Sequence, residues 1–377
     1  MDLVSKLARA QAQRGHEVVI YTSDYKLDEE FIASLPEVKI YPLHCALNLA
    51  QFYFTPGLVK MVKDNLGSFD IAHLHCFRSF QNIVIHHYAR KYGIPYVLDS
   101  HGSLPRKAAG ETGLKWLLRW LFDTLFGNRI LRDATKVIAE TQLGVSEYQE
   151  FGVGQEGITL IPPPFDTEAF AQLPPQGRFR KRYYLEDKKI AMFLGRINRI
   201  KGLDFLVRSF HKLTKARNDA RLVIVGNDEG YKATLDKLIA HLNLADKVLF
   251  TGFLSGEDKL SALVDADVVI QTSRYEQGAW APFEAVLCGT PIIVSSNSGA
   301  GEDVRRIDAG YLVEFGNEEE LARLMLKVLE DPTEATAKAK KAAAYIREKM
   351  SITSRIADYE RLYAECIGAK QTLSKER

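Results

Sequence analysis

The chain has 377 residues, of which 46% are hydrophobic and 26% charged, and its formal net charge is +2. This length predicts two domains rather than one core, and the small net charge argues against a nucleic-acid-binding protein. No apolar run reaches the ~18 residues of a membrane-spanning helix, and the four cysteines lack zinc-site spacing. We therefore expect a cytoplasmic protein with reduced thiols.

Short runs rich in β-branched residues alternate with amphipathic segments along the whole chain. In the first half, the predicted strands are 17–22, 38–43, 69–75, 96–100, 136–139 and 158–161. In the second half they are 189–194, 221–225, 247–251, 267–272, 291–295 and 310–314, with helices between them, for example at 203–213 and 318–329. Near-continuous apolar runs fit parallel strands buried on both faces. The pattern therefore predicts an α/β protein with doubly wound parallel sheets.

Clustered prolines separate the two series of strands. Residues 161–164 read Ile-Pro-Pro-Pro and residues 173–177 read Leu-Pro-Pro-Gln-Gly, which is typical of a connector. We predict Rossmann-like domains over 1–170 and 171–350, a helix that returns to the first domain over 351–367, and a polar tail over 368–377. Because ligands of open α/β sheets bind beyond the carboxyl ends of the strands, two such domains facing each other would enclose a cleft.

The chain begins with an amphipathic helix, residues 2–13, that leads directly into the predicted strand 17–22. A doubly wound domain has a parallel strand ahead of its first crossover helix, and none precedes this helix. We therefore expect the natural gene product to be longer by about 15–30 residues. Expressed from Met1, the chain is expected to be poorly soluble or inactive.

A basic loop follows the first strand of the second series. The strand ends at Gly195, the loop begins with Arg196 and includes Lys201, and the next helix starts near Gly202. Backbone N–H groups and the dipole at a helix start favour an anion. Arg196 and Lys201 could add two positive charges that hold a diphosphate and neutralise it as it leaves. The alternative is a solvated basic loop, and spacing alone does not decide between the two.

Two carboxylates, Glu276 and Glu284, lie eight positions apart across a glycine-containing loop and a helix start. One carboxylate near a helix start can bind the vicinal hydroxyls of a ribose, and another in the loop can meet sugar hydroxyls. Helix capping by exposed acids is the simpler interpretation of the pair alone. In register with the basic loop, the pair favours a nucleotide-sugar site.

These motifs resemble the donor-binding half of the retaining family 4 glycosyltransferases, which have the GT-B fold. Residues 190–315 contain the GR-x₄-KG loop, the Val225-Gly226 turn, the strand end at 250–253 and the E-x₇-E box in the family's order. The N-terminal half resembles the family more weakly, through RGHEVVIYTSD and IPPPFDTEAF. The resemblance implies an enzyme that transfers a sugar with retention from a nucleotide-diphosphate sugar to a hydroxyl acceptor.

The resemblance also implies which residues surround the donor. Arg196 and Lys201 bind its diphosphate, Glu284 binds the ribose and Glu276 meets the transferred sugar. Other donor-binding positions are Gly226, Phe253, Leu254 and Gly278. Arg196, Lys201 and Glu276 are expected to be catalytic together with His101. No cofactor beyond the donor is expected, because the two cations make a catalytic metal unnecessary.

Several histidines and aspartates allow both a functional and a structural interpretation. His101 follows a predicted strand, and in the family a histidine here approaches the donor sugar, so we favour that role over a purely structural one. His73 and His75 also lie at a strand end, and we interpret them as structural, with an acceptor-side contact as the alternative. Asp265 and Asp267 have the spacing of a metal-binding DxD motif, but Asp267 opens a strand and we interpret both as structural.

Residues 115–126 are apolar over much of the circumference of a predicted helix. Basic residues lie in or beside this segment, at Lys107, Lys115, Arg119, Arg129 and Arg132. One interpretation is an interfacial helix that touches an anionic membrane, which would make the protein peripheral on the inner membrane face. The other, which we favour slightly, is a buried crossover helix with basic ends.

Two further functions are compatible with this architecture. A sugar-nucleotide epimerase or hydrolase would release free nucleotide without an acceptor. An inactive homologue would act as a partner subunit; the intact donor motifs argue against it, and the missing N-terminal loop argues for it. A glycosyltransferase remains the leading prediction.

Overall fold

The structure is a computed structural model that describes residues 2–49, 52–105, 114–276, 278 and 280–375. The chain divides into two compact units. Unit 1 comprises Met1–Pro164 together with Met350–Arg377, and unit 2 comprises Phe165–Lys349.

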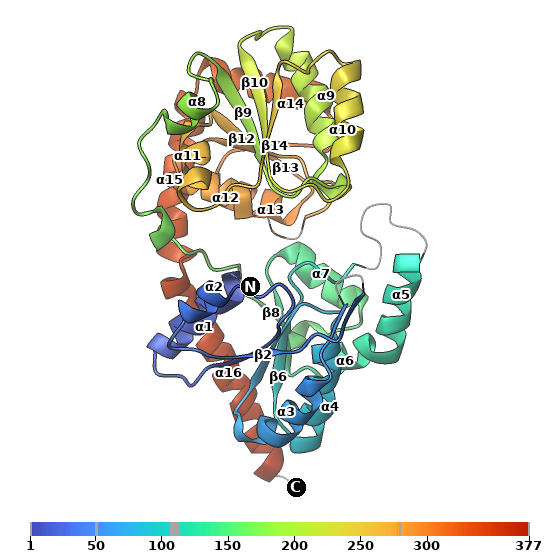
Figure 1. Ribbon diagram of the computed structural model, residues 1–377. Helices are drawn as coiled ribbons and strands as arrows, with labels where there is room; N and C mark the ends of the chain where they lie inside the picture. Colours follow the sequence, from blue (N-terminus) through green and yellow to red (C-terminus); the bar gives the residue numbers. More distant parts are fainter. Residues whose placement is uncertain (1, 50–51, 106–113, 277, 279, 376–377) are drawn as a thin grey trace. The chain divides into compact units, whose positions relative to one another are not determined.

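Unit 2 is built on a six-stranded parallel sheet with the order β11-β10-β9-β12-β13-β14 (Figure 1). Its strands are β9 (Lys189–Leu194), β10 (Ala220–Val225), β11 (Val248–Gly252), β12 (Val268–Gln271), β13 (Ile292–Ser295) and β14 (Tyr311–Val313). The chain starts at β9, moves outward to β11 and then returns to β12 on the other side of β9. This reversal makes the carboxyl ends of β9 and β12 a topological switch point, where ligands of doubly wound sheets bind.

Helices cover both faces of this sheet. One layer comprises α9 (Leu203–Thr214), α10 (Lys232–His241) and α14 (Glu318–Glu330), whose apolar side chains share a core with alternate residues of the strands. The other helices of unit 2 are α8 (Arg178–Arg182), α11 (Gly256–Asp265), α12 (Trp280–Leu287), α13 (Gly299–Ile307) and α15 (Thr333–Lys349). Strands buried on both faces explain why the sequence shows unbroken apolar runs here.

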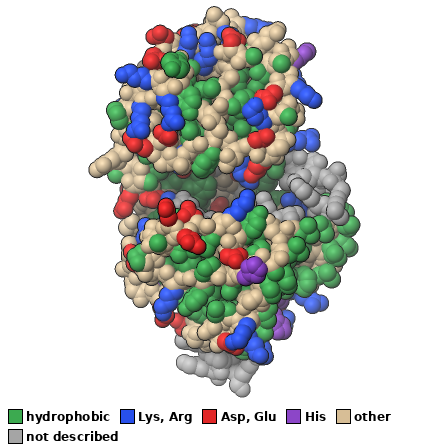
Figure 2. Space-filling view, in the orientation of Figure 1, with side chains coloured by type: hydrophobic (Ala, Val, Ile, Leu, Met, Phe, Trp, Pro, Cys, Tyr) green, Lys and Arg blue, Asp and Glu red, His purple; other side chains and the backbone are tan. Residues whose placement is uncertain are grey.

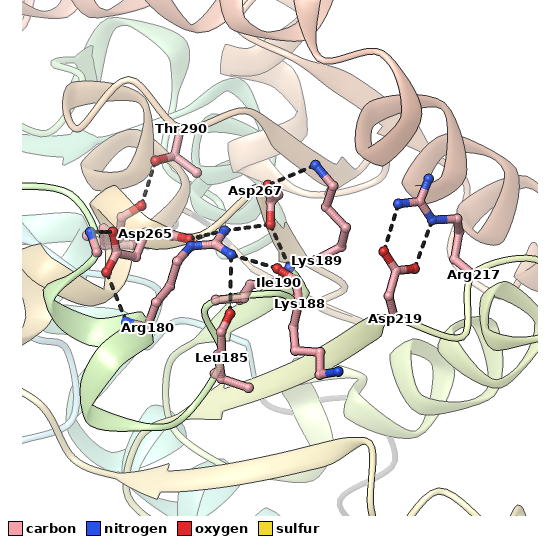
Figure 3. A network of polar contacts seen from close by, with 12 residues as sticks. Arg180, Leu185, Lys188, Lys189, Ile190, Arg217, Asp219, Asp265, Asp267 and Thr290 are labelled. Carbon is pink, nitrogen blue, oxygen red and sulfur yellow. Dashed lines mark hydrogen bonds and ion pairs between the residues drawn. The ribbon is translucent and has the colours of Figure 1, made fainter.

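Two aspartates, one at the end of α11 and one just ahead of β12, fasten α8 to the rest of unit 2 (Figure 3). Asp265 accepts hydrogen bonds from the backbone N–H groups of Phe179 and Arg180, at 2.8 and 3.0 Å. Asp267 accepts from the backbone N–H of Ile190 at 2.6 Å and from the Arg180 guanidinium at 2.8 Å. These contacts agree with the structural interpretation of both residues.

In unit 1 the parallel strands form two separate sheets. The first pairs β1 (Val19–Ser23) with β2 (Lys39–Leu43), and the second has the order β5-β6-β7-β8. The strands of the second sheet are β5 (Ala72–His75), β6 (Tyr96–Asp99), β7 (Lys136–Ala139) and β8 (Ile158–Leu160). Within the described part of unit 1, no strand joins β1 to β5, so the expected single sheet is divided.

An antiparallel pair, β3 (Leu47–Leu49) with β4 (Phe52–Phe54), was not predicted. Each strand has only three residues, and Leu47 and Leu49 are exposed. Such short strands carry no alternation of buried and exposed residues from which they could be recognised.

Helices pack on both faces of the four-stranded sheet. Val97 and Ile138 share a core with Leu7 of α1 (Asp2–Gln13) and Ile356 of α16 (Ile352–Lys375). The neighbouring side chain of Leu98 belongs to the opposite core, because successive strand residues point to opposite faces. Further helices of unit 1 are α2 (Glu29–Ala33), α3 (Gly57–Asn65), α4 (Phe80–Tyr92), α6 (Asn128–Asp133) and α7 (Gln142–Glu150).

The favoured interpretation of residues 115–126 as a buried crossover helix is wrong. They form α5 (Leu114–Phe122) and the start of a π-helical turn, Asp123–Gly127. Phe122 and Asp123 face inward, the first against the rings of Phe52 and Phe77 and the second fully buried. Large apolar side chains remain exposed at Leu117, Leu118, Trp120, Leu121, Leu125 and Phe126.

Hydrophobic side chains accordingly gather on the surface where α5 lies (Figure 2). An apolar composition does not reveal which part of a helix finds a packing partner, and here Phe122 in the last turn packs against other rings of unit 1. Lys107 lies outside the described residues. Among the helices that the structure describes, none is long and apolar enough to cross a membrane.

Candidate functional site

The basic loop lies at the switch point of unit 2, between β9 and the start of α9. It is joined to the loop after β10, because the backbone N–H of Ile197 donates to Asn227 O at 2.8 Å. Gly226 allows the two loops to approach: its φ is +146°, and a Cβ there would lie 1.9 Å from the carbonyl oxygen of Gly195. Gly226 thus shapes the loop through its missing side chain.

Gly202 plays the same part on the other side of the loop. Its φ is +63°, and a Cβ would lie 2.0 Å from the carbonyl oxygen of Thr272, just beyond the end of β12. The hydroxyl of Thr272 in turn donates to Gly202 O at 3.2 Å. The start of α9 therefore packs directly against the segment that follows β12.

This packing brings two predicted residues together. The ammonium of Lys201 forms an ion pair with the carboxylate of Glu276. Only 13% of the Lys201 side chain and 16% of the Glu276 side chain are exposed, and the Ser273 hydroxyl donates to the same carboxylate at 3.1 Å. Sequence reasoning did not identify Ser273 as part of the site.

Arg196 also has an acidic partner that the sequence did not reveal. Its guanidinium lies 3.2 Å from Glu229, which also accepts a hydrogen bond from the Asn198 amide at 2.8 Å. Glu229 follows the Val225-Gly226 turn at the end of β10, and this position in the sequence could have indicated it as a site residue. The Arg196 side chain is 63% exposed, which leaves it free to change partner.

Glu284 lies on α12, where its carboxylate pairs with Lys259 of α11 at 2.9 Å. Its position in the second turn of α12 rules out the capping of that helix. Gly278 is half-buried, whereas its neighbours Gln277 and Ala279 lie outside the described residues.

The loop after β11 carries the two positions expected to frame the base. Phe253 is 66% exposed, whereas Leu254 is buried. The structure therefore offers an accessible aromatic ring beside a fixed backbone, both at the carboxyl edge of the sheet.

His101 lies in unit 1 in a cluster of titratable side chains at the carboxyl edge of the four-stranded sheet. Its Nδ1 is 2.9 Å from Oε1 of Glu140 and 3.3 Å from Oδ1 of Asp99. Its Nε2 is 2.9 Å from Nδ1 of His75. Both ring nitrogens are thus occupied within unit 1, and contact with the donor sugar stays a prediction.

Asp99 and Glu140 were not singled out from the sequence. Asp99 is the last residue of β6, and Glu140 directly follows β7. These two strands are neighbours in the sheet, and this adjacency could have indicated both residues. Burial raises the pKa of Asp99 to about 7. Burial alone would lower the pKa of His101, but the Asp99 charge and the hydrogen bond to Glu140 raise it to about 9.

The two other histidines differ in their surroundings. Nδ1 of His73 lies 2.7 Å from the hydroxyl of Tyr363, on α16, and burial, with a smaller effect of His101, lowers the pKa of His73 to about 3. His75 is half-buried, and burial followed by its histidine neighbours lowers its pKa well below the ordinary value. The contact with Tyr363 agrees with the structural interpretation of His73.

Two family models match almost the whole chain. Residues 176–348 match "Glycosyl transferases group 1", and residues 3–169 match "Glycosyltransferase Family 4". A 2-deoxystreptamine glucosyltransferase of Streptomyces kanamyceticus is 26% identical over 73% of this chain and 72% of its own length. A GDP-mannose-dependent mannosyltransferase of Mycolicibacterium smegmatis, which acts on a phosphatidylinositol monomannoside, is 26% identical over 86% and 84%.

Solved structures agree in fold. HepE of Anabaena, in complex with UDP, has a TM-score of 0.77 at 19% identity and covers 96% of this chain and 95% of its own. WaaG, a glycosyltransferase involved in lipopolysaccharide biosynthesis, has a TM-score of 0.73 at 16% identity, with coverage of 96% and 95%. The chain belongs to the family 4 glycosyltransferases, enzymes of the GT-B fold with two Rossmann-like domains that use nucleotide-sugar donors.

Proposed function

We propose that this enzyme transfers a sugar, with retention of the anomeric configuration, from a nucleoside-diphosphate sugar to a hydroxyl acceptor. The observation that carries the proposal is the ion pair of Lys201 with Glu276 at the β9/β12 switch point, beside the exposed charge of Arg196. A diphosphate and a sugar together need both cations and an acid at one edge of the sheet, and these three residues supply them.

The two cations have different tasks in this proposal. Arg196 is exposed and paired with Glu229, so an arriving diphosphate can replace that carboxylate as its partner. Lys201 is held by Glu276 and keeps a positive charge in a fixed place. There it would neutralise the charge that develops on the leaving diphosphate.

Glu276 and Glu284 would hold the two sugars of the donor. Glu276 is fixed by Lys201 and Ser273 and would accept hydrogen bonds from the transferred sugar. Glu284, paired with Lys259, would accept from the ribose hydroxyls. Each side chain has further oxygen lone pairs that can accept hydrogen bonds.

The surroundings of Glu276 favour front-face transfer over a covalent glycosyl-enzyme. A carboxylate that already bonds an ammonium and a hydroxyl is a weak nucleophile. In the proposed step the bond from the anomeric carbon to the diphosphate breaks and the bond to the acceptor oxygen forms on the same face. The acceptor proton passes to an oxygen of the leaving diphosphate.

Two donors deserve to be tested first. HepE was solved with UDP and with UDP-glucose, and the mycobacterial relative is described as GDP-mannose-dependent. We propose incubating this enzyme with UDP- and GDP-sugars, with and without glycan and lipid acceptors, and measuring nucleoside diphosphate release. Release that requires an acceptor supports transfer, whereas release without one favours a hydrolase, and none with any donor favours an inactive homologue.

We further propose that α5 places the enzyme on an anionic membrane at its cytoplasmic face. Leu117, Trp120 and Leu121 are exposed, and Arg129 and Arg132 are exposed in the following helical turns. An apolar surface beside basic side chains fits the interface of anionic lipids.

The membrane proposal is tested by sedimentation with vesicles of phosphatidylglycerol and phosphatidylcholine. Binding should fall in high salt and in a Trp120→Ser/Leu121→Ser variant, whereas Leu173→Ser, an exposed leucine of unit 2, serves as the control. Equal sedimentation of both variants would contradict the membrane proposal, and so would the absence of wild-type sedimentation at low salt.

A further inference from the structure

The cluster around His101 places two buried carboxyl groups beside one imidazole. The Asp99 side chain is 2% exposed and that of Glu140 is 8% exposed. Within the part of the chain that the structure describes, His101 is the one basic side chain within ion-pair distance of either carboxylate. Two buried carboxyl groups beside one imidazole form a set of oxygen and nitrogen ligands of the kind that binds a divalent cation.

We propose that Asp99, His101 and Glu140 bind a divalent transition-metal cation, with Zn²⁺ as the representative ion. The ligand atoms are Nδ1 of His101, a carboxylate oxygen of Asp99 and a carboxylate oxygen of Glu140, which all lie within 4.8 Å of one another. With a neutral imidazole, two carboxylates and a dication, the charge of the site becomes zero.

The distances suit such an ion. Zinc binds imidazole nitrogen and carboxylate oxygen at about 2.0–2.2 Å, so neighbouring ligand atoms of a tetrahedral or octahedral site lie about 2.9–3.5 Å apart. Nδ1 of His101 lies 2.9 Å from the Glu140 oxygen and 3.3 Å from the Asp99 oxygen. Nitrogen together with carboxylate oxygen is a donor set that suits zinc.

His75 has the position of a supporting residue. Its Nδ1 lies 2.9 Å from Nε2 of His101, and the two rings are parallel to within 1°. When Nε2 of His101 donates to His75, the lone pair of Nδ1 is left to face the two carboxylates. Metal-binding histidines commonly donate their second ring N–H to such a partner, which fixes the tautomer and the ring orientation.

The ligands come from neighbouring elements of one sheet. Asp99 ends β6, His101 follows it by two residues, and Glu140 follows β7. A metal here would cross-link the carboxyl ends of β6 and β7 and would act as a structural clamp. Under this assignment His101 is a metal ligand in unit 1, and the proposal does not depend on the transfer reaction.

The test is calorimetric titration of Zn²⁺ into chelator-treated full-length protein, with metal content measured independently after dialysis. The wild type should bind one ion per chain. Glu140→Gln and Asp99→Asn, which keep the shape of each ligand, should weaken binding by about 100-fold or more. Bound Zn²⁺ should also raise the melting temperature of the wild type.

Asp133→Asn is the matched control, because Asp133 makes a similar carboxylate contact to a histidine, at 2.8 Å from His86. Binding should be unchanged in this variant. Absence of Zn²⁺ binding by the wild type would overturn the proposal, because protons and not a metal ion would then neutralise the carboxylates. Equal binding by the wild type, Glu140→Gln and Asp99→Asn would also overturn it, since the ion would then lie elsewhere. If either ligand variant fails to fold, Co²⁺ absorption of the wild type decides, because spectra without an imidazole–carboxylate signature contradict the assignment.

Discussion

Replacing Lys201 by Met separates the structural from the chemical task of this residue. Methionine keeps most of the apolar stem and removes the charge, so Glu276 loses its ionic partner. Both side chains are about 15% exposed, which places the pair between an exposed pair, worth ~0–1 kcal/mol, and a fully buried one, where removing one partner costs ~3–5 kcal/mol. We therefore expect Lys201→Met to lower the free energy of unfolding by about 2–3 kcal/mol.

The double variant Lys201→Met/Glu276→Gln should recover much of this stability, because a neutral amide needs no ionic partner. Turnover should behave differently. Loss of the charge at the leaving diphosphate should reduce kcat by about 10²–10³-fold, and the double variant should regain none of it. Stability is measured by urea denaturation, and turnover by acceptor-dependent release of the nucleoside diphosphate.

Two results would refute this reasoning. Near-normal turnover in Lys201→Met would show that the ion pair is structural only. Recovery of turnover together with stability in the double variant would show that Lys201 acts merely by holding Glu276.

Three further variants test other contacts in unit 2. Glu229→Gln removes the acid that competes for Arg196, so nucleoside diphosphate affinity measured by calorimetry should rise up to about 5-fold; weaker binding would mean that Glu229 contacts the ligand. Asp265→Ala leaves backbone N–H groups of α8 without an acceptor and should lower the free energy of unfolding by about 3 kcal/mol. A change below about 1 kcal/mol would contradict the anchoring of α8 by Asp265. Gly202→Ala places a methyl group against a backbone oxygen at a positive φ, so urea denaturation should show that the free energy of unfolding falls by at least about 2 kcal/mol. Wild-type stability would contradict the close approach of α9 to the segment after β12.

Most of unit 2 could be predicted from the sequence, for a physical reason. Its strands β9, β10 and β12 are buried on both faces, so their apolar runs stand out against the amphipathic helices between them. The site-forming loops were recognisable because backbone geometry restricts them. Gly202, for example, tolerates no side chain.

What the sequence did not reveal are contacts between loops that are distant in the chain. Glu229 meets Arg196 across 33 positions, and Glu140 meets His101 across 39. Pairings of this kind depend on strand order, which local pattern does not encode. The exposure of α5 was missed for a similar reason, because it depends on which neighbouring element covers the helix.

The central claim is that a nucleoside diphosphate binds at the β9/β12 switch point through Arg196, Lys201 and Glu284. Calorimetric titration of UDP and GDP into the wild type and three variants tests it most directly. Arg196→Ala and Glu284→Gln should each weaken binding of the preferred nucleotide by about 10-fold or more. Arg208→Ala removes an exposed arginine of α9 and should bind as tightly as the wild type. Binding that survives unchanged in Arg196→Ala and Glu284→Gln, or that falls equally in Arg208→Ala, would contradict the account.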